Sequence, residues 1–573
     1  MQKVLSRNIK IIWRYIHISL ILILTGCAAG QIGKNNSGEF KNGMVVSANG
    51  IASKVGVEIL KKGGNAVDAA VAVQFALSVV YPNAGNIGGG GFMVYRAVSG
   101  ESNTLDFREK APSAASRDMY LDSLGNPLAD KSLHGQIASG VPGSVAGMEA
   151  AHKKYGKLSW SVLLQPAIDL AKNGFPITKR QASELNANHP KFMRYNPEGT
   201  ALIKLTGPWQ ESDLLIQKEL ATTLKLIQKK GKAGFYEGAV ADSIVAEMKA
   251  GNGIITHEDL KDYKAIWRKP ITGNFKGYDI IAMPPPSSGG IALVQLLESV
   301  EPYPFKKWGH NADSTFQVMV EAERRVYADR ATHLGDPDFY NVPQTKLLNP
   351  AYNKNRMASF SFDSASTSAS IKAGKVGIAE HLETTHFSIV DHDGNAVAIT
   401  TTLNASYGSM IVVKGAGFLL NDEMDDFSVK AGAPNMFGLV GGKANEIAAN
   451  KRMLSSMTPT ILAKDGKLFM IVGTPGGSTI ITSVFQTILN VIDFDMTMQQ
   501  AVDAKRFHHQ WLPDQVDVEK GAVDSVAIEK LKSKGYKIVK SGNIGRVDAI
   551  LRTPWGKYQG GADQRGDDQV AGY

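Results

Sequence analysis

Apolar positions near the start of the folded region follow the spacing of a strand and two helices. Met44–Ser47 is a short, mostly apolar run that predicts a strand, and Ile51–Lys62 has the pattern of a helix. Ala66–Val80 is apolar on nearly every face, so we expect a buried helix there. Asn65 can cap this helix, and Asp68 lies in its first turn.

A run of glycines, Gly88–Gly91, precedes a strand predicted at Phe92–Tyr95. Phosphate-binding loops lead from a strand into a helix, so close backbone packing near a site is the better interpretation of these glycines. Leu105–Glu109 is expected to end the next strand. Arg108 then has two interpretations. By default it forms an ion pair with Glu109 at the surface; in a pocket it could instead form a bidentate hydrogen bond with a substrate carboxylate.

Helical periodicity dominates residues 145–330. A strand predicted at Tyr278–Met283 interrupts it and ends at three prolines. We interpret this block as a helical layer with support for a sheet. The helices predicted in it include Leu158–Lys172, Asp213–Lys229, Ala239–Met248 and Thr315–Asp329.

A β-hairpin is predicted around an Asp-Gly-Asn turn at residues 393–395. Residues 387–389 and 396–400 supply alternation on either side of this turn. Thr384 and Thr385 stand at the head of the first strand.

The residues before this hairpin indicate a cleavage point. Residues 357–370 are mainly Ser, Ala, Thr and Asp without periodicity, too small and polar to bury much surface, so we expect a flexible segment. If the chain is cut before Thr384, that threonine gains an α-amine with a pKa near ~8, which can act as base for its own hydroxyl. On these residues alone, a surface loop entering a hairpin is favoured over an N-terminal nucleophile.

Composition indicates a globular protein, because 43% of the 573 residues are hydrophobic and 20% are charged. The net charge is +9, and four of these charges lie in an N-terminal leader. The remaining positive charge is spread without a long basic run, so nucleic-acid binding has little support. The leader residues are Lys3, Arg7, Lys10 and Arg14.

The leader resembles that of a bacterial lipoprotein. Its apolar run, Ile16–Leu24, is too short to span a bilayer. It ends in Leu-Thr-Gly-Cys, which resembles a lipobox, and Cys27 is the one cysteine of the chain. We therefore expect a signal peptide over residues 1–26, a lipid on Cys27 and a tether over residues 27–43; an ordinary secretory leader is the alternative. Export also fits the absence of any other thiol, although with one cysteine no internal disulfide is possible.

Several other motifs narrow the chemistry. His508 and His509 have no third metal ligand at suitable spacing, so a packed or hydrogen-bonded pair is the better interpretation. The sequence contains neither a Gly-x-Ser-x-Gly elbow nor a His-Glu-x-x-His motif, which weakens the serine-hydrolase and zinc-protease interpretations. Leu454–Pro459 and Ile471–Ser478 carry small or hydroxyl residues next to strands, where they can face a cleft.

Taken together, the motifs resemble the γ-glutamyltranspeptidase family, in order and spacing, from about Met44 to Tyr573. The motifs that carry the resemblance are Gly63–Ala70, Gly88–Met93, Asp106–Glu109, Thr384–His386, Asp425–Phe427, Leu454–Met457 and Gly473–Gly477. The resemblance favours the nucleophile interpretation of Thr384.

The resemblance implies an N-terminal-nucleophile hydrolase fold, an αββα sandwich of two stacked antiparallel sheets flanked by helices. It implies a precursor that cuts itself between Glu383 and Thr384. The products would be a large subunit, residues 44–383 after the tether, with a flexible C-terminal segment at 357–380, and a small subunit, residues 384–573. They would form a heterodimer without a cofactor or metal.

The resemblance also implies the reaction. Thr384 would attack the γ-amide carbonyl of glutathione or another γ-glutamyl compound, and the acyl group would pass to water or to an amino acid or dipeptide. Gly476 and Gly477 would bind the developing oxyanion through backbone N–H groups. Thr402 would orient the nucleophile.

Recognition of the substrate's amino-acid end is implied for six residues. Arg108, Ser455 and Ser456 would hold its α-carboxylate, and Asn404, Glu423 and Asp426 its α-ammonium. Two positions depart from many relatives: the lid loop has Phe437 where many bacterial members have tyrosine, and Glu423 is glutamine in some relatives. The phenylalanine leaves lid closure and the ratio of hydrolysis to transfer undetermined. The glutamate leaves selectivity for the ammonium undetermined.

Other functions remain as alternatives. A cephalosporin or glutaryl amide acylase of the same family need not recognise an α-ammonium. Another related class transfers poly-γ-glutamate to cell walls. A lipid-anchored protein that binds γ-glutamyl peptides without catalysis is the alternative from a different class. The resemblance of the leader also favours a periplasmic location, with Ala28 after the cysteine favouring the outer membrane.

Overall fold

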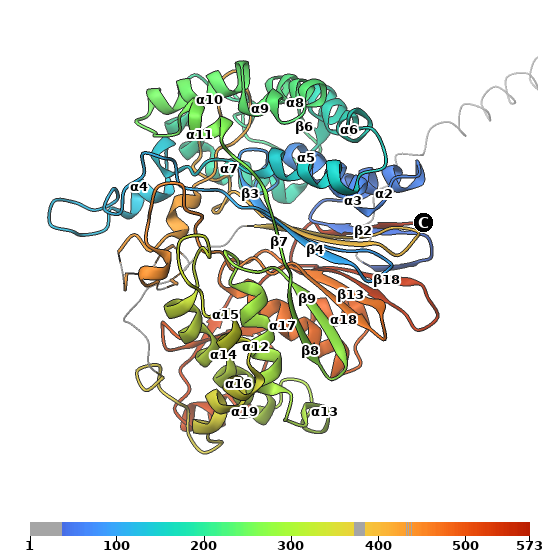
Figure 1. Ribbon diagram of the computed structural model, residues 1–573, viewed down its shortest axis with the longest axis vertical. Helices are drawn as coiled ribbons and strands as arrows, with labels where there is room; N and C mark the ends of the chain where they lie inside the picture. Colours follow the sequence, from blue (N-terminus) through green and yellow to red (C-terminus); the bar gives the residue numbers. More distant parts are fainter. Residues whose placement is uncertain (1–36, 372–383, 431, 434, 437, 440) are drawn as a thin grey trace, which may run out of the picture. The chain divides into compact units, whose positions relative to one another are not determined.

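The computed structural model of the protein describes residues 37–371 and 384–573, except residues 431, 434, 437 and 440. Two antiparallel sheets of seven strands each are stacked at the centre of this part of the chain (Figure 1). The β10 sheet has the order β19 (Gln569–Gly572), β2 (Met44–Ser47), β10 (Thr385–Val390), β11 (Ala396–Thr402), β3 (Gly90–Arg96), β4 (Ser102–Phe107) and β7 (Ile266–Arg268). The β13 sheet has the order β1 (Ser37–Phe40), β18 (Tyr558–Ala562), β17 (Asp548–Arg552), β13 (Lys467–Gly473), β12 (Thr460–Lys464), β9 (Tyr278–Ala282) and β8 (Ile271–Phe275).

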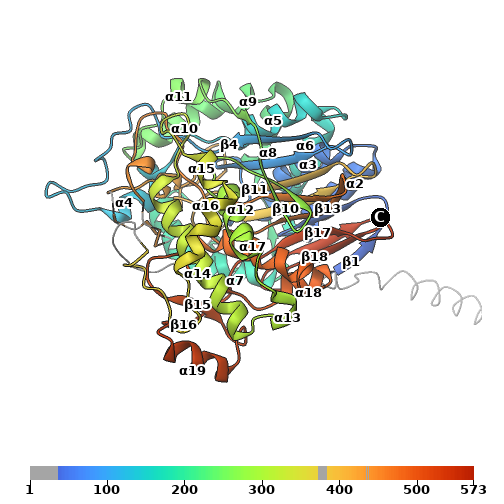
Figure 2. The same ribbon diagram turned by 60° about the horizontal axis from the view of Figure 1, so that its bottom comes forward.

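Helices cover the outer face of each sheet, as Figures 1 and 2 show. Those on the side of the β10 sheet include α2 (Gly50–Lys61), α3 (Ala66–Val80), α5 (Ser144–Tyr155), α6 (Trp160–Asn173), α7 (Lys179–Tyr195), α8 (Lys218–Lys230) and α10 (Ala239–Ala250). Those on the side of the β13 sheet include α12 (Gly289–Val300), α14 (Asp313–His333), α16 (Pro350–Arg356), α17 (Thr479–Ile492), α18 (Met498–Asp503) and α19 (Ser525–Ser533). The predicted αββα sandwich is confirmed.

Shorter elements complete the described chain. The short helices are α4 (Ala129–Leu133), α9 (Ala233–Tyr236), α11 (His257–Lys261), α13 (Phe305–Trp308), α15 (Gln344–Leu347), η1 (Gln136–Ala138), η2 (Met357–Ser359), η3 (Glu423–Asp426) and η4 (Lys443–Asn445). The remaining strands are β5 (Phe175–Pro176), β6 (Leu214–Leu215), β14 (Phe507–His508), β15 (Val516–Glu519) and β16 (Ile538–Ser541). No helix within the described residues has both the length and the apolar composition to cross a bilayer.

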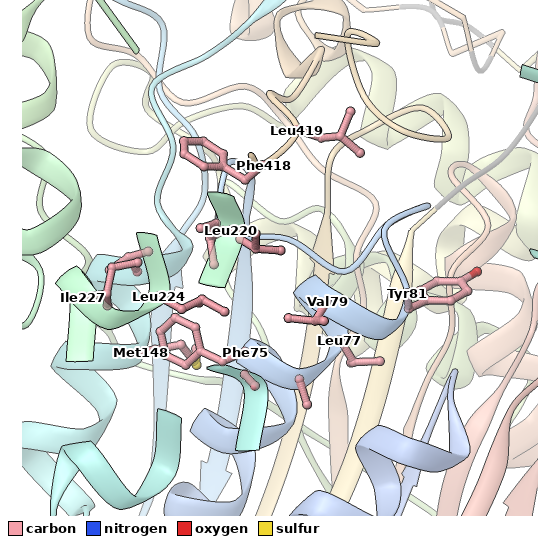
Figure 3. Close-up of a cluster of buried hydrophobic side chains, with 14 of the residues drawn as sticks. Phe75, Leu77, Val79, Tyr81, Met148, Leu220, Leu224, Ile227, Phe418 and Leu419 are labelled. Carbon is pink, nitrogen blue, oxygen red and sulfur yellow. The ribbon is translucent and has the colours of Figure 1, made fainter. Parts of the chain in front are cut away.

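The helix α3 forms the centre of the core beside the β10 sheet. Every one of its residues is buried, as its all-round apolar pattern predicts. Figure 3 shows Phe75 of α3 close to Met148 of α5 and Leu224 of α8. Asn65 and Asp68 form a capping box at its N-terminus, which confirms the predicted cap.

Alternation along the hairpin separates two cores. Phe387 and Ile389 of β10 face the helices, where they pack in the same core as α3. Ala396 and Ala398 of β11 face the β13 sheet and pack between the two sheets. Both strands are therefore buried on both faces.

Glycines of the predicted cluster lie against neighbouring backbone. A Cβ atom added to Gly89 would lie 2.0 Å from the carbonyl oxygen of Thr402, and one added to Gly91 would lie 2.4 Å from that of Thr400. The close-packing interpretation is confirmed, and it places the end of β11 directly against this cluster.

Two segments differ from the sequence-based predictions. The helix predicted at Asp213–Lys229 begins only at Lys218, because residues 214–215 form β6 and pair with Phe175–Pro176 of β5. This tertiary pairing overrides the helical pattern.

The segment predicted to be flexible also differs where it is described. Ser368 is buried; its backbone N–H donates to the Asp514 carboxylate and its hydroxyl donates to the Trp511 carbonyl. Arg325 donates to the hydroxyl of Ser366. Residues 357–371 are thus fastened to α14 and to the loop after β14, because the small polar side chains satisfy buried donors and acceptors there. The rest of the predicted segment, residues 372–380, lies outside the described residues.

Candidate active site

Thr384 lies immediately before β10, and only 4% of its surface is exposed. β10 is hydrogen-bonded between β2 and β11, so its first residues are held at the end of the central strands. Thr384 lines a pocket at this end. The other residues that line it are Arg108, Thr402, Asn404, Glu423, Asp426, Leu439, Ser455, Ser456, Met457, Gly477 and Ile480. The structure therefore gathers nine of the predicted site residues around one cavity.

Thr402, the last residue of β11, presents its hydroxyl to this pocket. Its Oγ1 accepts a hydrogen bond from the backbone N–H of Asn404 at 2.8 Å. Asn404 has a φ of +78°, a turn conformation that asparagine tolerates, and its side-chain amide donates to the carbonyl of Asp422 at 3.0 Å. Because Thr402 Oγ1 accepts from the backbone, its own proton is left to donate.

Arg108 is completely buried just after β4 and is surrounded by carboxylates. Its guanidinium donates to Glu423 and Asp426, and it lies 3.4 Å from a carboxylate oxygen of Glu109. The interpretation of Arg108 and Glu109 as a surface pair is wrong, because both side chains are 0% exposed. Arg108 lies in the pocket.

Burial dominates the electrostatics of these groups. Burial raises the pKa of Glu109 to about 7, against the opposing effect of Arg108. Burial also holds the pKa of Glu423 well above its ordinary value and raises that of Asp426. Burial acts to lower the pKa of Arg108, but the carboxylates of Glu423, Asp426 and Glu109 outweigh it, and the net shift is upward. Three acids around one guanidinium leave surplus acceptor oxygens, which suit an added ammonium group.

Ser455 and Ser456 line the pocket but have other partners. The hydroxyl of Ser455 accepts from the backbone N–H of Met457 at 3.2 Å. The hydroxyl of Ser456 accepts from Arg330 of α14 at 2.9 Å. Within the described residues, neither hydroxyl is hydrogen-bonded to Arg108.

Gly476 and Gly477 form the turn between β13 and α17. Their φ values are +139° and +49°, and a Cβ atom on Gly476 would lie 2.5 Å from Thr479 Oγ1, so glycine is required there. Gly477 lines the pocket and Gly476 is the preceding residue. Neither N–H group donates to any acceptor in the described chain. At the N-terminus of a helix, such N–H groups suit a developing negative charge.

Arg330 and Ser288 were not predicted as site residues. An arginine near the end of a helix with several charged residues gives no signal of a role at the pocket, and Ser288 follows a proline-rich turn. Arg330 Nε donates to Ser288 Oγ at 2.9 Å, and both side chains are buried.

Other predicted positions fall outside this pocket or outside the described residues. His508 and His509 are buried and hydrogen-bonded, for example His508 to Thr482 at 2.8 Å, which confirms the packed-pair interpretation. Glu383, Phe437 and Cys27 lie outside the described residues.

Comparison with known proteins places this pocket in a family. The sequence profile of the family described as gamma-glutamyltranspeptidase matches residues 52–573. The chain is 47% identical over 535 residues to the glutathione hydrolase proenzyme of Escherichia coli (strain K12), which covers 93% of this chain and 92% of that protein.

Solved structures show the same fold. The structure of cephalosporin acylase from Bacillus halodurans aligns with a TM-score of 0.81 at 26% identity, covering 95% of this chain and 98% of that one. A chain of Helicobacter pylori gamma-glutamyltranspeptidase aligns with a TM-score of 0.56 at 46% identity, covering 58% of this chain and 96% of that one. The match to the family profile and the relative at 47% identity both extend over nearly the whole chain, and on this basis the protein belongs to the γ-glutamyltranspeptidase family.

Proposed function

We propose that this protein is a γ-glutamyl amide hydrolase and acyltransferase that acts on glutathione and related γ-glutamyl compounds. The observation that carries the proposal is a single pocket in which Thr384 lies with one arginine and two of the acids that surround it. A nucleophile beside groups for both a carboxylate and an ammonium suits the zwitterionic end of a γ-glutamyl substrate.

The precursor is proposed to cut the bond between Glu383 and Thr384. The Thr384 oxygen attacks the Glu383 carbonyl carbon, the C–N bond breaks, and water hydrolyses the resulting ester. Thr384 then has a free α-amine, which can accept the proton of its own hydroxyl in each turnover.

Turnover then proceeds in two halves. The Thr384 oxygen forms an ester bond to the γ-carbonyl carbon as the amide C–N bond breaks, and the proton passes through the α-amine to the leaving nitrogen. Water, or the amine of an amino acid or dipeptide, attacks the ester and restores the threonine. The Gly476 and Gly477 N–H groups stabilise the oxyanion of both steps, with each such donor contributing roughly 3–4 kcal/mol in other enzymes.

Recognition of the substrate requires an exchange of partners at Arg108. Its guanidinium is engaged with Glu423 and Asp426. A substrate α-carboxylate can take over part of this guanidinium, and the acids it releases can accept from the substrate's α-ammonium. The exchange keeps the buried charges paired, because Arg108 gains the substrate carboxylate and the released acids gain the substrate ammonium.

An amide acylase is the second candidate, favoured by the structural similarity to a cephalosporin acylase. A glutaryl amide carries the same terminal carboxylate without the ammonium. With a glutaryl amide, the acids around Arg108 would have no substrate ammonium from which to accept hydrogen bonds. The presence of these acids therefore favours γ-glutamyl substrates.

The test compares γ-glutamyl-p-nitroanilide with glutaryl-p-nitroanilide on the purified, processed protein. We expect kcat/KM for the γ-glutamyl amide to be at least ~30-fold higher than for the glutaryl amide. Losing one hydrogen bond to a charged group changes an affinity by about this factor. An added dipeptide such as glycylglycine should increase p-nitroaniline release and yield the γ-glutamyl dipeptide. A preference for the glutaryl amide would instead assign the protein to the acylases.

We also propose that the protein is exported and anchored through a lipid on Cys27, with the outer membrane favoured. The support is the leader, in which the single cysteine of the chain follows Leu-Thr-Gly. Labelling with radioactive palmitate in a bacterial host should mark the wild type and not the Cys27→Ser variant. Equal labelling of the two, or none in either, would contradict lipidation.

A further inference from the structure

Arg330 of α14 is a buried cation that hydrogen-bonds to hydroxyl groups and forms no direct ion pair with the described carboxylates. Only 4% of its surface is exposed. Its hydrogen-bond partners are two hydroxyls, Ser288 Oγ and Ser456 Oγ, each at 2.9 Å. No carboxylate of the described residues lies within ion-pair distance of it, in contrast to the three carboxylates around Arg108.

The contact with Arg330 determines how Ser456 can bond. A hydroxyl has one proton, and the Arg330 N–H group, which has no acceptor capacity, occupies an oxygen lone pair of Ser456. The Ser456 hydroxyl therefore has its own proton to donate, and it donates to no acceptor among the described residues. Since Ser456 lines the pocket, the natural acceptor is an anion bound there.

Arg330 also fixes the backbone on which both serines lie. Its Nε group donates to Ser288 Oγ, and Ser288 in turn donates to the Ser455 carbonyl through its hydroxyl at 2.7 Å and its backbone N–H at 2.8 Å. The Ser455 N–H donates to the Pro286 carbonyl at 3.0 Å. Arg330 is thus hydrogen-bonded to the Ser455–Ser456 segment directly, through the Ser456 hydroxyl, and indirectly, through the Ser288 hydroxyl.

The two arginines near the pocket have different partners. Glu423 and Asp426 surround Arg108, so acceptor oxygens are in excess there. Arg330 contacts the Ser456 hydroxyl and adds a positive charge in a place shielded from water, near enough to Asp426 to interact with its charge. An anion is therefore favoured beside Ser456.

We propose that Arg330 is a positioning residue that makes Ser456 a hydrogen-bond donor to the substrate's α-carboxylate and supplies the positive charge behind that contact. This inference rests on the proposed function, because it concerns the same substrate end. It assigns carboxylate selectivity partly to a residue that does not line the pocket.

Three substrates separate this role from a general structural one. γ-Glutamyl-p-nitroanilide has both charged groups, glutaryl-p-nitroanilide has only the carboxylate, and 4-aminobutyryl-p-nitroanilide has only the ammonium. In the Arg330→Met variant, KM for the first two should rise about 10- to 100-fold, the range for a lost hydrogen bond to a charged group. KM for the third, and kcat for all three, should change less than about 3-fold.

Two further variants complete the test. Arg330→Lys retains the charge and N–H donors but lacks the planar guanidinium that bonds two hydroxyls at once. We therefore expect a smaller increase in KM, again only for the substrates with a carboxylate. This variant decides the question if Arg330→Met does not fold or cleave itself. Adding Ser456→Ala to Arg330→Met should cost much less than Ser456→Ala costs alone, because the two residues act through one contact.

Equal losses on the three substrates, or additive effects of the two substitutions, would overturn the inference and leave Arg330 a structural residue. Failure of the proposed function has a different signature, in which the wild-type protein itself does not turn over γ-glutamyl-p-nitroanilide.

Discussion

At the scale of single residues, the pocket is defined by charges that must compensate one another. Arg108, Glu423 and Asp426 were each predicted to contact substrate, and all three line the cavity. Their contacts with one another could not be predicted, because the hydrogen bond between Arg108 and Glu423 joins segments 315 residues apart. Arg330 escaped prediction for the same reason: its role depends on hydroxyls contributed by two other segments.

The Asp426→Ala substitution tests the ammonium contact. It removes a carboxylate that can accept from the substrate's α-ammonium, so KM for γ-glutamyl-p-nitroanilide should rise by about 10- to 100-fold. KM for a glutaryl amide, which lacks that ammonium, should change far less. Steady-state kinetics of both substrates on the processed variant checks this, and equal increases in KM would remove the basis for a γ-glutamyl specificity.

At the scale of elements, periodicity predicted most strands and helices near the site. Ala66–Val80 has the predicted bounds, and the hairpin has the predicted turn and alternation. The predictions failed where long-range contacts decided the conformation. Residues 214–215 pair with another strand, and Ser366 and Ser368 fill buried hydrogen-bond positions, neither of which their local sequence indicates.

The packing of Gly89 on β11 leads to a second prediction. A Cβ atom there would lie 2.0 Å from the Thr402 carbonyl oxygen, so Gly89→Ala must displace the end of β11 that carries the Thr402 hydroxyl. We expect about 1–3 kcal/mol of destabilisation and a fall in kcat of about 10- to 100-fold. Gly542→Ala is the control, because a Cβ atom at Gly542 meets nothing within 4 Å. Similar kcat values for the two variants would refute the role of this contact.

His386 on β10 should make stability depend on pH. Burial lowers its pKa to about 3, whereas an exposed histidine titrates near ~6.5. Between these values the unfolded chain binds a proton that the folded chain does not. The free energy of unfolding should therefore fall by about 1.4 kcal/mol per pH unit below pH ~6.5 and be unaffected by this group above it.

Urea titrations of the wild type and His386→Gln at several pH values measure this slope. The comparison cancels the buried carboxyls common to both proteins. Between pH ~6 and ~4, the free energy of unfolding should fall less steeply with decreasing pH in the variant than in the wild type. The two slopes should differ by about 1.4 kcal/mol per pH unit. Parallel curves would show that His386 is not the group responsible.

At the scale of the whole molecule, the two sides of the proposed cut are interleaved. β10 and β11 follow Thr384 in the chain, yet β10 pairs with β2 and β11 pairs with β3, both of which precede it. The β13 sheet likewise combines β8 and β9 with β12 and β13. Cleavage before Thr384 therefore leaves both sheets intact.

This interleaving predicts that the two cleaved pieces stay together. Size-exclusion chromatography without denaturant should elute them in one peak, and guanidinium chloride should separate them. Elution in two peaks under native conditions would contradict the arrangement of strands described here.

The intact mass and N-terminal sequence of the purified protein, measured beside a Thr384→Ala variant, test the nucleophile assignment. We expect two chains in the wild type, the smaller beginning at Thr384 and ending at Tyr573, and a single uncut chain in the variant, with γ-glutamyl turnover only in the wild type. A wild-type chain that stays uncut and inactive would contradict the nucleophile assignment and favour a protein that binds γ-glutamyl compounds without catalysis.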